Sequence, residues 1–271
     1  MKISFRWLGV AGLELSLNNH VMVIDPYFTR FPLRKAFLGR VEPDRSLIAE
    51  KIKQCDFVLI THAHPDHLMD APDVVRNTGA MIIGSPNACR LLNVCGVPGD
   101  RIREVKAGDK LALAEFQVKV YLSQHVKIPG YLPGKLRDVL KPPLRARDYR
   151  MDKDFSFLLS VENLRLLTDP GERPESAVAA DVLFLFPRRD DAYCRTLLSR
   201  VQPKLVILTH WDDFFRPLSK PLQPHIQIQG LARTFPPLQR VNPGKFGRMI
   251  EHLSPQTKVL VPEIFRRYEL P

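Results

Sequence analysis

The chain has 271 residues, of which 45% are hydrophobic and 25% are charged, the composition of a globular protein that buries a large core. No apolar run approaches the roughly 20 residues of a membrane-spanning helix. Glu14 and Asn18-Asn19 interrupt the N-terminal apolar run, so we expect no signal peptide. The four cysteines form no CxxC pair and are expected to be buried thiols of a cytoplasmic protein.

The formal net charge of +11 is concentrated in two Pro-rich stretches. Residues 127–153 carry eight basic and three acidic side chains, and residues 216–271 carry nine basic and three acidic ones. A basic balance usually marks only a solvated face, but this clustering favours an anionic partner, whether a phosphate ester, a phospholipid head group or nucleic acid.

The first part of the chain predicts a β-meander, with turns at Gly9/Gly12 and Asn18-Asn19. Its three strands are expected at 3–8, 12–17 and 20–25. An irregular stretch then runs to about residue 46, and a short helix over 47–54 precedes a buried strand over 57–60.

Four candidate metal ligands follow that strand within six residues, in the run THAHPDH at 61–67. Residues two apart in an extended segment project to the same side, so His62 and His64 can converge on one ion. Asp66 and His67, after the bend that proline favours, can face a second ion. A single histidine is usually structural, but three imidazoles and a carboxylate packed together need partners when buried. The run therefore predicts a metal site.

Strands and helices alternate through the rest of the chain, which predicts a layered α/β arrangement. Helices are expected over 72–77, 87–94 and 192–200, with helical signals at 226–233. Strands are expected over 81–83, 111–122 (a pair), 155–161, 164–168, 182–186, 205–208 and 259–261.

Three further candidate ligands each follow an apolar run: His125, Asp169 and His210. Alone, each histidine would more often be structural, and an Asp before Pro-Gly is more often a turn residue. Asp181 is the fallback for Asp169. Asp25 is either a partner that orients a ligating imidazole or a turn residue before proline.

The run 61–67 and the order of the later residues resemble the signature of the metallo-β-lactamase-fold hydrolases. The resemblance covers roughly residues 1–215 and implies a four-layer αββα sandwich, here as a single domain over 1–271. Carried over position by position, it implies a first metal on His62, His64 and His125. It implies a second on Asp66, His67 and His210, with Asp169 bridging the two.

Imidazole and carboxylate ligands without thiolate suit two zinc ions and also admit Mn²⁺ or Fe²⁺. Diiron flavoprotein relatives typically carry Glu where this chain has His64, which argues against reduction of oxygen. Such a pair of ions lowers the pKa of a trapped water and makes hydroxide available for hydrolysis. Asp66 is the candidate catalytic residue that orients this hydroxide.

Residues 7–9, 23–26 and 209–214 look most like the branch that contains L-ascorbate-6-phosphate lactonase and N-acyl-phosphatidylethanolamine phospholipase D. This implies a small anionic or phospholipid-like substrate, cleaved at a phosphate-bearing ester, a phosphodiester or a lactone. We expect residues 127–153 to form a lid, in which Arg145, Arg147 or Arg150 contacts a substrate phosphate. Trp211 is expected to line the substrate pocket.

Two other functions fit the sequence less closely. One is a nuclease that cleaves RNA or DNA, which the charge favours but for which stacking aromatic residues are not evident. The other is a non-catalytic binding protein that keeps the metals for stability. Within the basic C-terminal segment 216–271, the Pro-rich stretches 217–224 and 236–243 are expected to cover the site or to pack on a second copy in a homo-oligomer.

Overall fold

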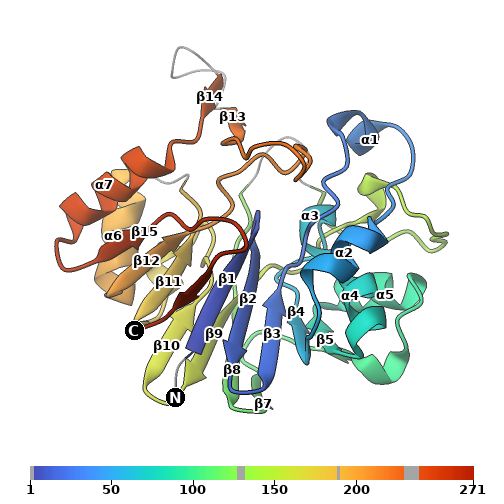
Figure 1. Cartoon of the computed structure of the whole chain (residues 1–271), viewed down its shortest axis with the longest axis horizontal. Helices are drawn as coiled ribbons and strands as arrows, with labels where there is room; N and C mark the ends of the chain where they lie inside the picture. Colours follow the sequence, from blue (N-terminus) through green and yellow to red (C-terminus); the bar gives the residue numbers. More distant parts are fainter. Residues whose placement is uncertain (1–2, 127–131, 188–189, 229–237) are drawn as a thin grey trace.

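Two seven-stranded β-sheets lie face to face and carry helices on both outer sides (Figure 1). This computed structural model describes residues 3–126, 132–187, 190–228 and 238–271. Both sheets contain parallel and antiparallel neighbours, in agreement with the alternation of strand and helix signals along the chain.

The first sheet begins as an antiparallel meander and continues with parallel strands, in the order β16-β1-β2-β3-β4-β5-β6. Its strands are β1 Ile3–Gly9, β2 Gly12–Leu17, β3 His20–Ile24, β4 Phe57–Leu59, β5 Met81–Gly84, β6 Ile102–Glu104 and β16 Arg267–Glu269. The register pairs Ile24 with Leu59 and Leu59 with Ile83, so β3, β4 and β5 end together. The histidine run 61–67 leaves the sheet at this edge.

The second sheet has the order β15-β12-β11-β10-β9-β8-β7. Its strands are β7 Lys110–Leu113, β8 Phe116–Leu122, β9 Phe155–Val161, β10 Leu164–Leu167, β11 Val182–Leu185, β12 Leu205–Leu208 and β15 Lys258–Leu260. Because β10, β11 and β12 are parallel, Asp169 and His210 both follow C-terminal strand ends on the same edge. A separate hairpin pairs β13 Ile226–Ile228 with β14 Leu238–Arg240.

Successive side chains of a strand point to opposite faces of its sheet. They therefore pack alternately between the two sheets and beneath the outer helices. In β11, Val182 and Phe184 pack between the sheets, whereas Leu183 and Leu185 pack against the outer helices. The inner core also takes Phe5 and Trp7 of β1, both fully buried. These apolar layers make the two sheets a rigid frame for the residues at their edge.

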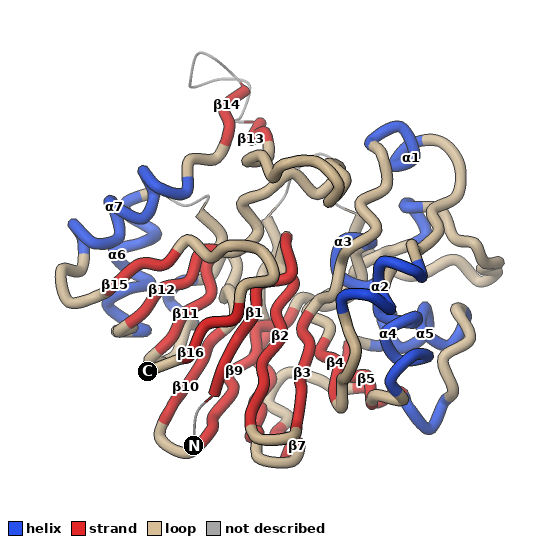
Figure 2. The backbone as a smooth tube through the Cα atoms, in the orientation of Figure 1, coloured by secondary structure: helices blue, strands red, loops and turns tan. Residues whose placement is uncertain are grey.

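Helices cover the outer faces of both sheets (Figure 2). The first sheet carries α2 Arg45–Lys51, α4 Ala71–Thr78 and α5 Pro86–Val94, and the second carries α6 Asp191–Val201 and α7 Pro243–Leu253. The shorter elements are α1 Leu33–Phe37, α3 Pro65–Leu68 and the 3₁₀ turns η1 Gly99–Arg101, η2 Ala146–Asp148 and η3 Pro174–Ser176. The expected αββα sandwich is thus confirmed.

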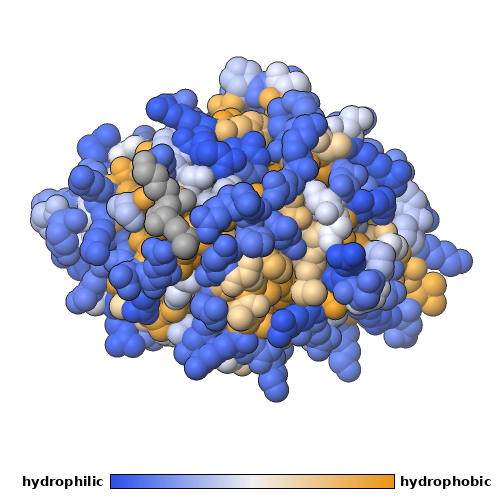
Figure 3. All heavy atoms as spheres, turned by 60° about the horizontal axis from the view of Figure 1, so that its bottom comes forward, coloured by the Kyte–Doolittle hydropathy of each residue, from blue (hydrophilic) through white to orange (hydrophobic). Residues whose placement is uncertain are grey.

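Hydrophilic residues cover most of the face that Figure 3 brings forward, with apolar residues gathered near its centre. Within the described part of the chain, none of the helices combines the length and the apolar character that crossing a bilayer requires.

The second half of the chain departs most from the sequence prediction. The helical signal at 226–233 is wrong for its first three residues, which form β13, and residues 229–233 lie outside the described part. Helix α7 was not predicted, although Asn242 accepts a hydrogen bond from the Lys245 amide and Pro243 occupies the first turn. The edge strand β16 was also missed, because it exists only through its pairing with β1, more than 250 residues away in sequence.

Candidate metal centre

The run 61–67 changes from extended backbone to helix at the edge of the first sheet. His64 is extended, with φ −77° and ψ 157°, and Pro65 occupies the first position of α3. Since His62 and His64 precede the helix and Asp66 and His67 lie on it, the four side chains separate into two pairs. The polypeptide itself therefore sets up two groups of candidate ligands.

Three imidazoles form the first group. The candidate ligand atoms of His62, His64 and His125 lie within 4.8 Å of one another. The ring centroids are 4.7 Å apart for His62–His64 and 4.8 Å apart for both pairs with His125. His125 comes from the second sheet, where it follows β8, so this group spans both sheets.

Asp66, His67 and His210 form the second group, whose candidate ligand atoms also lie within 4.8 Å of one another. The Oδ2 atom of Asp66 lies 3.6 Å from Nε2 of His67 and 3.7 Å from Nε2 of His210. His210 follows β12 and again brings in the second sheet. The ring centroids of His62 and His67 are 3.8 Å apart, so the two groups adjoin.

Hydrogen bonds at Nδ1 orient several of these imidazoles. Nδ1 of His67 lies 2.8 Å from Oδ2 of Asp25, and Nδ1 of His125 lies 2.6 Å from the Val126 carbonyl oxygen, to which it donates. Asp25 also accepts from the Thr61 amide at 2.8 Å. Fixing Nδ1 as the donor leaves Nε2 as the basic nitrogen, the arrangement usual for metal-ligating histidines.

The surroundings of Nε2 of His62 indicate whether a cation fits the first group. It is buried and has no hydrogen-bond partner within the described residues. Buried polar atoms are rarely left unsatisfied, so this nitrogen calls for a partner that side chains do not supply. A divalent cation held with His64 and His125 provides one, and the donor set suits zinc, manganese or iron.

Asp154 adjoins the first group and was not identified from sequence. Its Oδ1 lies 3.3 Å from Nδ1 of His62. The neighbouring backbone is fixed, because the Phe155 amide donates to the Thr61 carbonyl and the Ser123 amide donates to the Asp154 carbonyl. Asp154 precedes its strand, whereas the sequence search considered only residues that follow strands. A search of both strand ends would have included it.

Burial and mutual repulsion favour the neutral forms of His62, His64 and His125. Burial also lowers the pKa of His67, but the carboxylates of Asp25 and Asp66 outweigh it and raise that pKa to about 9. Burial, followed by repulsion from His125, lowers the pKa of His64 to about 3, and burial lowers that of His125 to about 4. Burial raises the pKa of Asp154 to about 7. Burial alone would raise the pKa of Asp66, but His67 and His210 hold it well below its usual range. Neutral imidazoles and an ionised carboxylate are the forms that bind cations.

Asp169 is not among the six residues of the two groups. Its Oδ1 accepts from the Gly171 amide at 2.7 Å and its Oδ2 accepts from the Phe186 amide at 2.9 Å. Its charge reaches the centre, since it raises the pKa of Asp154. Asp181, the fallback, pairs with Lys204 at the start of β11, at the opposite end of the strand. The bridging role of Asp169 stays a prediction.

The candidate substrate-binding residues lie in different surroundings. Arg145 and Arg147 are exposed around η2, which contacts α1, and Arg150 is half-buried. Trp211 packs on Trp7 with ring centroids 5.1 Å apart, which places it against the inner core. The ring of Phe186 lies 5.0 Å from that of His210 and was not predicted. Residues 127–131 of the expected lid lie outside the described part of the chain.

A buried ion pair fixes the loop that carries His210. Arg30 and Asp212, both with fully buried side chains, form a salt bridge, and Oδ1 of Asp212 accepts from the Val10 amide at 2.9 Å. The His210 amide donates to the Val10 carbonyl at 2.7 Å. Val10 and His210 both have positive φ, at 49° and 57°, which non-glycine residues adopt only when contacts of this kind hold them.

Position 9 requires glycine because the guanidinium group of Arg30 packs against its backbone. The φ of Gly9 is +92°, and a Cβ atom there would lie 2.2 Å from Nη2 of Arg30. Gly9→Ala is expected to destabilise the fold by more than about 1 kcal/mol, because it adds a steric clash to backbone strain. Urea unfolding against Gly39→Ala, which has a similar φ of +94° and nothing within 4 Å of its Cβ, isolates the clash. An equal loss of unfolding free energy in both variants would contradict this explanation.

The thiols are unsuited to nucleophilic attack. Burial raises the pKa of Cys55 and Cys89 to about 12 and that of Cys95 to about 11. At mildly alkaline pH we therefore expect iodoacetamide to leave the native chain unlabelled and its activity intact, whereas all four cysteines should react after denaturation. Mass spectrometry measures the labelling; rapid labelling of the native chain together with loss of activity would implicate a cysteine.

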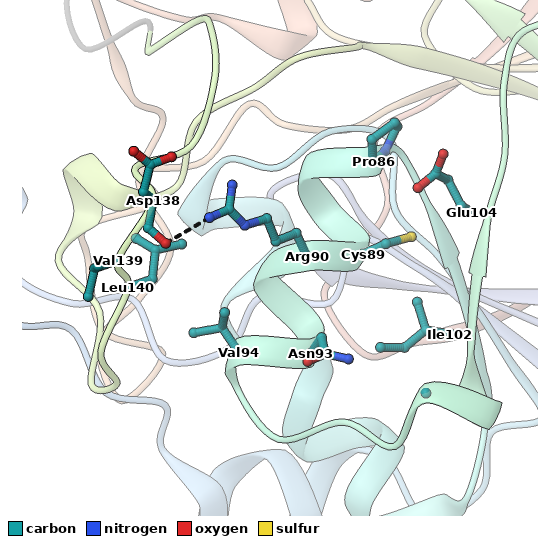
Figure 4. A pocket seen from close by; sticks show the side chains of 11 residues that line it. Pro86, Cys89, Arg90, Asn93, Val94, Ile102, Glu104, Asp138, Val139 and Leu140 are labelled. Carbon is teal, nitrogen blue, oxygen red and sulfur yellow. Dashed lines mark hydrogen bonds between the residues drawn. The ribbon is translucent and has the colours of Figure 1, made fainter.

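A cavity of about 690 Å³ lies away from the two ligand groups, between α5 and residues 138–140 (Figure 4). Arg90 donates from this helix to the Asp138 carbonyl oxygen at 2.9 Å. None of the candidate ligands lines this cavity, so we assign the chemistry to the histidine centre.

Comparison with known proteins agrees with this geometry. Residues 20–135 match the family described as "Beta-lactamase superfamily domain". A UPF0173 metal-dependent hydrolase from Methylocella silvestris is 30% identical over 119 residues, which cover 44% of this chain and 46% of that protein, less than half of each. Another, from Caldivirga maquilingensis, is 24% identical over 239 residues, which cover 82% of this chain and 92% of that protein.

The solved structure of Igni18, a novel metallo hydrolase from Ignicoccus hospitalis, matches with a TM-score of 0.64 and 16% identity. The match covers 100% of this chain and 99% of that one, and at this identity it supports the fold alone. Together with the family match over residues 20–135 and the arrangement of two sheets and flanking helices, it shows that the chain has the metallo-β-lactamase fold.

Proposed function

We propose that this metal-dependent hydrolase holds two divalent cations, zinc first among them, and cleaves an anionic, phosphate-bearing ester, phosphodiester or lactone. The observation that carries the proposal is the pairing of two adjoining ligand groups, one of three imidazoles and one of two imidazoles and a carboxylate. The relatives from Methylocella silvestris and Caldivirga maquilingensis are named metal-dependent hydrolases, which supports the reaction class.

His62, His64 and His125 would hold one cation, and Asp66, His67 and His210 the other. When bound, such a pair of cations makes a water acidic enough to act as hydroxide near neutral pH and polarises the bond under attack. The chain's own contribution is to present His62, His64 and His125 as neutral imidazoles at fixed positions and to place the Asp66 carboxylate between His67 and His210. An ionised Asp66 can accept a hydrogen bond from the attacking water and so orient it.

The charge near the site favours an anionic substrate. Segment 135–150 carries six basic and two acidic side chains, and it continues from Leu132, whose backbone hydrogen-bonds the side chain of His64. Arginine binds phosphate through its planar fork of donors, so Arg145, Arg147 and Arg150 are the candidate contacts. This segment belongs to the proposed lid over residues 127–153.

The test is a panel of substrates assayed with added Zn²⁺ or Mn²⁺. We expect hydrolysis of phosphate-bearing esters or lactones and none without metal. Arg145→Glu with Arg147→Glu is expected to raise KM for an anionic substrate while KM for a neutral lactone stays unchanged. The control, Arg195→Glu with Arg200→Glu on α6, makes the same change of charge on the other sheet. Equal KM values for all three proteins would refute substrate contact by η2.

Salt dependence separates this proposal from a nuclease. A small substrate makes few phosphate contacts, so its KM should change little with salt, whereas a polynucleotide that makes many would show a steep loss of binding. Inactivity on the whole panel with metal bound would favour a non-catalytic binding protein.

A further inference from the structure

The surface around α1 combines exposed apolar side chains with positive charge. Leu33 and Phe37, at the two ends of α1, are 52% and 76% exposed, and Leu38, directly after it, is 76% exposed. Those three are among only seven large hydrophobic side chains classed as exposed in the described part of the chain. None of the residues of α1 is fully buried, and Ala36, which is half-buried, packs against the core while Leu33 and Phe37 stay exposed.

Basic residues surround these three side chains. Residues 33–40 contain three basic and no acidic side chains, and residues 135–150 contain six basic and two acidic ones, a combined net charge of +7. The two segments are joined, because Arg40 donates to the Lys141 carbonyl oxygen at 2.8 Å and α1 contacts η2. Figure 1 shows α1 and this segment on the same side of the molecule. We call residues 33–40 and 135–150 the α1 surface.

A series of aromatic rings connects the metal centre to Phe31, two residues before α1. The ring of Phe214 lies 6.3 Å from that of His210 and 4.4 Å from that of Phe215, which in turn lies 5.7 Å from the ring of Phe31. The chain passes from Phe31 directly into α1.

We propose that the α1 surface binds the face of an anionic lipid bilayer, with Phe37 and Leu38 inserted among the acyl chains and the arginines on the head groups. Apolar insertion and electrostatic attraction together give stable membrane binding, whereas either one alone is weak. A second copy of this chain is disfavoured, since a symmetric contact through this surface would place +7 against +7. Nucleic acid would leave the aliphatic Leu33 and Leu38 without an apolar partner.

This binding does not rest on the proposed hydrolysis, so it is tested without substrate. The intact chain is sedimented with phosphatidylcholine vesicles and with vesicles that also contain phosphatidylglycerol. We expect binding only to the anionic vesicles. Phe37→Ser with Leu38→Ser should weaken that binding about tenfold or more, because two large apolar side chains no longer insert. Val261→Ser should leave it unchanged, because this exposed apolar residue follows β15, a strand on the opposite side of the molecule from α1 (Figure 1).

Charge-reversal variants test the electrostatic part of vesicle binding separately. Arg145→Glu with Arg147→Glu should weaken vesicle binding by about 25-fold or more, since each of the two basic side chains lost contributes about fivefold near such a membrane. Arg195→Glu with Arg200→Glu on α6 should not weaken it. Circular dichroism of each variant excludes unfolding. The proposal is overturned if the vesicles do not bind the chain, if neutral vesicles bind equally well, or if the Phe37 variant retains full binding.

Discussion

His125→Ala and His210→Ala are each expected to reduce the number of tightly bound divalent cations from two to one. The two histidines belong to separate groups of three candidate ligand atoms, so each substitution breaks one group and leaves the other complete. Both should lower kcat/KM by more than about a hundredfold, because even the loss of an outer hydrogen-bond partner of a ligand costs 10–100-fold.

Calorimetric titration of the metal-free chain with Zn²⁺ gives the stoichiometry, and Co²⁺ spectra of each variant report which group remains. His252→Ala is the control, since this residue lies in the last turn of α7. Loss of both cations in both variants would mean that the groups form one inseparable site. Retention of two cations in either variant would contradict the assignment of that histidine.

Arg30→Met is expected to destabilise the fold by about 3–5 kcal/mol, because it leaves the Asp212 carboxylate buried without its cation. The substitution keeps much of the side-chain volume, so the loss reports on charge rather than on a cavity. Urea unfolding measures it. The double variant with Asp212→Asn removes the stranded charge and keeps an acceptor for the Val10 amide.

The double variant should therefore be more stable than the sum of the two single variants implies. Strictly additive losses would show that the pair does not act as a unit. Since Asp212 and His210 both bind Val10, the single variants should also bind the second cation more weakly, while the first group keeps its affinity.

The parts of the fold that local pattern determines could be predicted from sequence. Strands β1 to β5 and helices α4 and α5 carry their own apolar periodicity and turn residues, and they lie within a few residues of the predicted bounds. Strand β16 carries only alternating exposed and half-buried residues and becomes a strand by pairing with β1. The pairing of two strands far apart in sequence leaves no pattern within either strand from which it could be predicted.

The residues of the candidate site likewise divide into those that local sequence predicts and those that only the folded chain reveals. The run 61–67 is local, and His125 and His210 could be found because each follows an apolar strand. Asp154 precedes its strand, and the Arg30–Asp212 pair joins residues 182 apart, so neither follows from local spacing. The exposed face of α1 was likewise not predicted, since exposure of Phe37 depends on what the folded chain leaves uncovered.

Anomalous diffraction from a crystal of the zinc-loaded chain tests the central claim most directly. We expect two zinc peaks per chain, one bound by His62, His64 and His125 and the other by Asp66, His67 and His210. A single peak, or zinc bound at other side chains while these six stay unligated, would contradict the dinuclear centre on which the proposed hydrolysis depends.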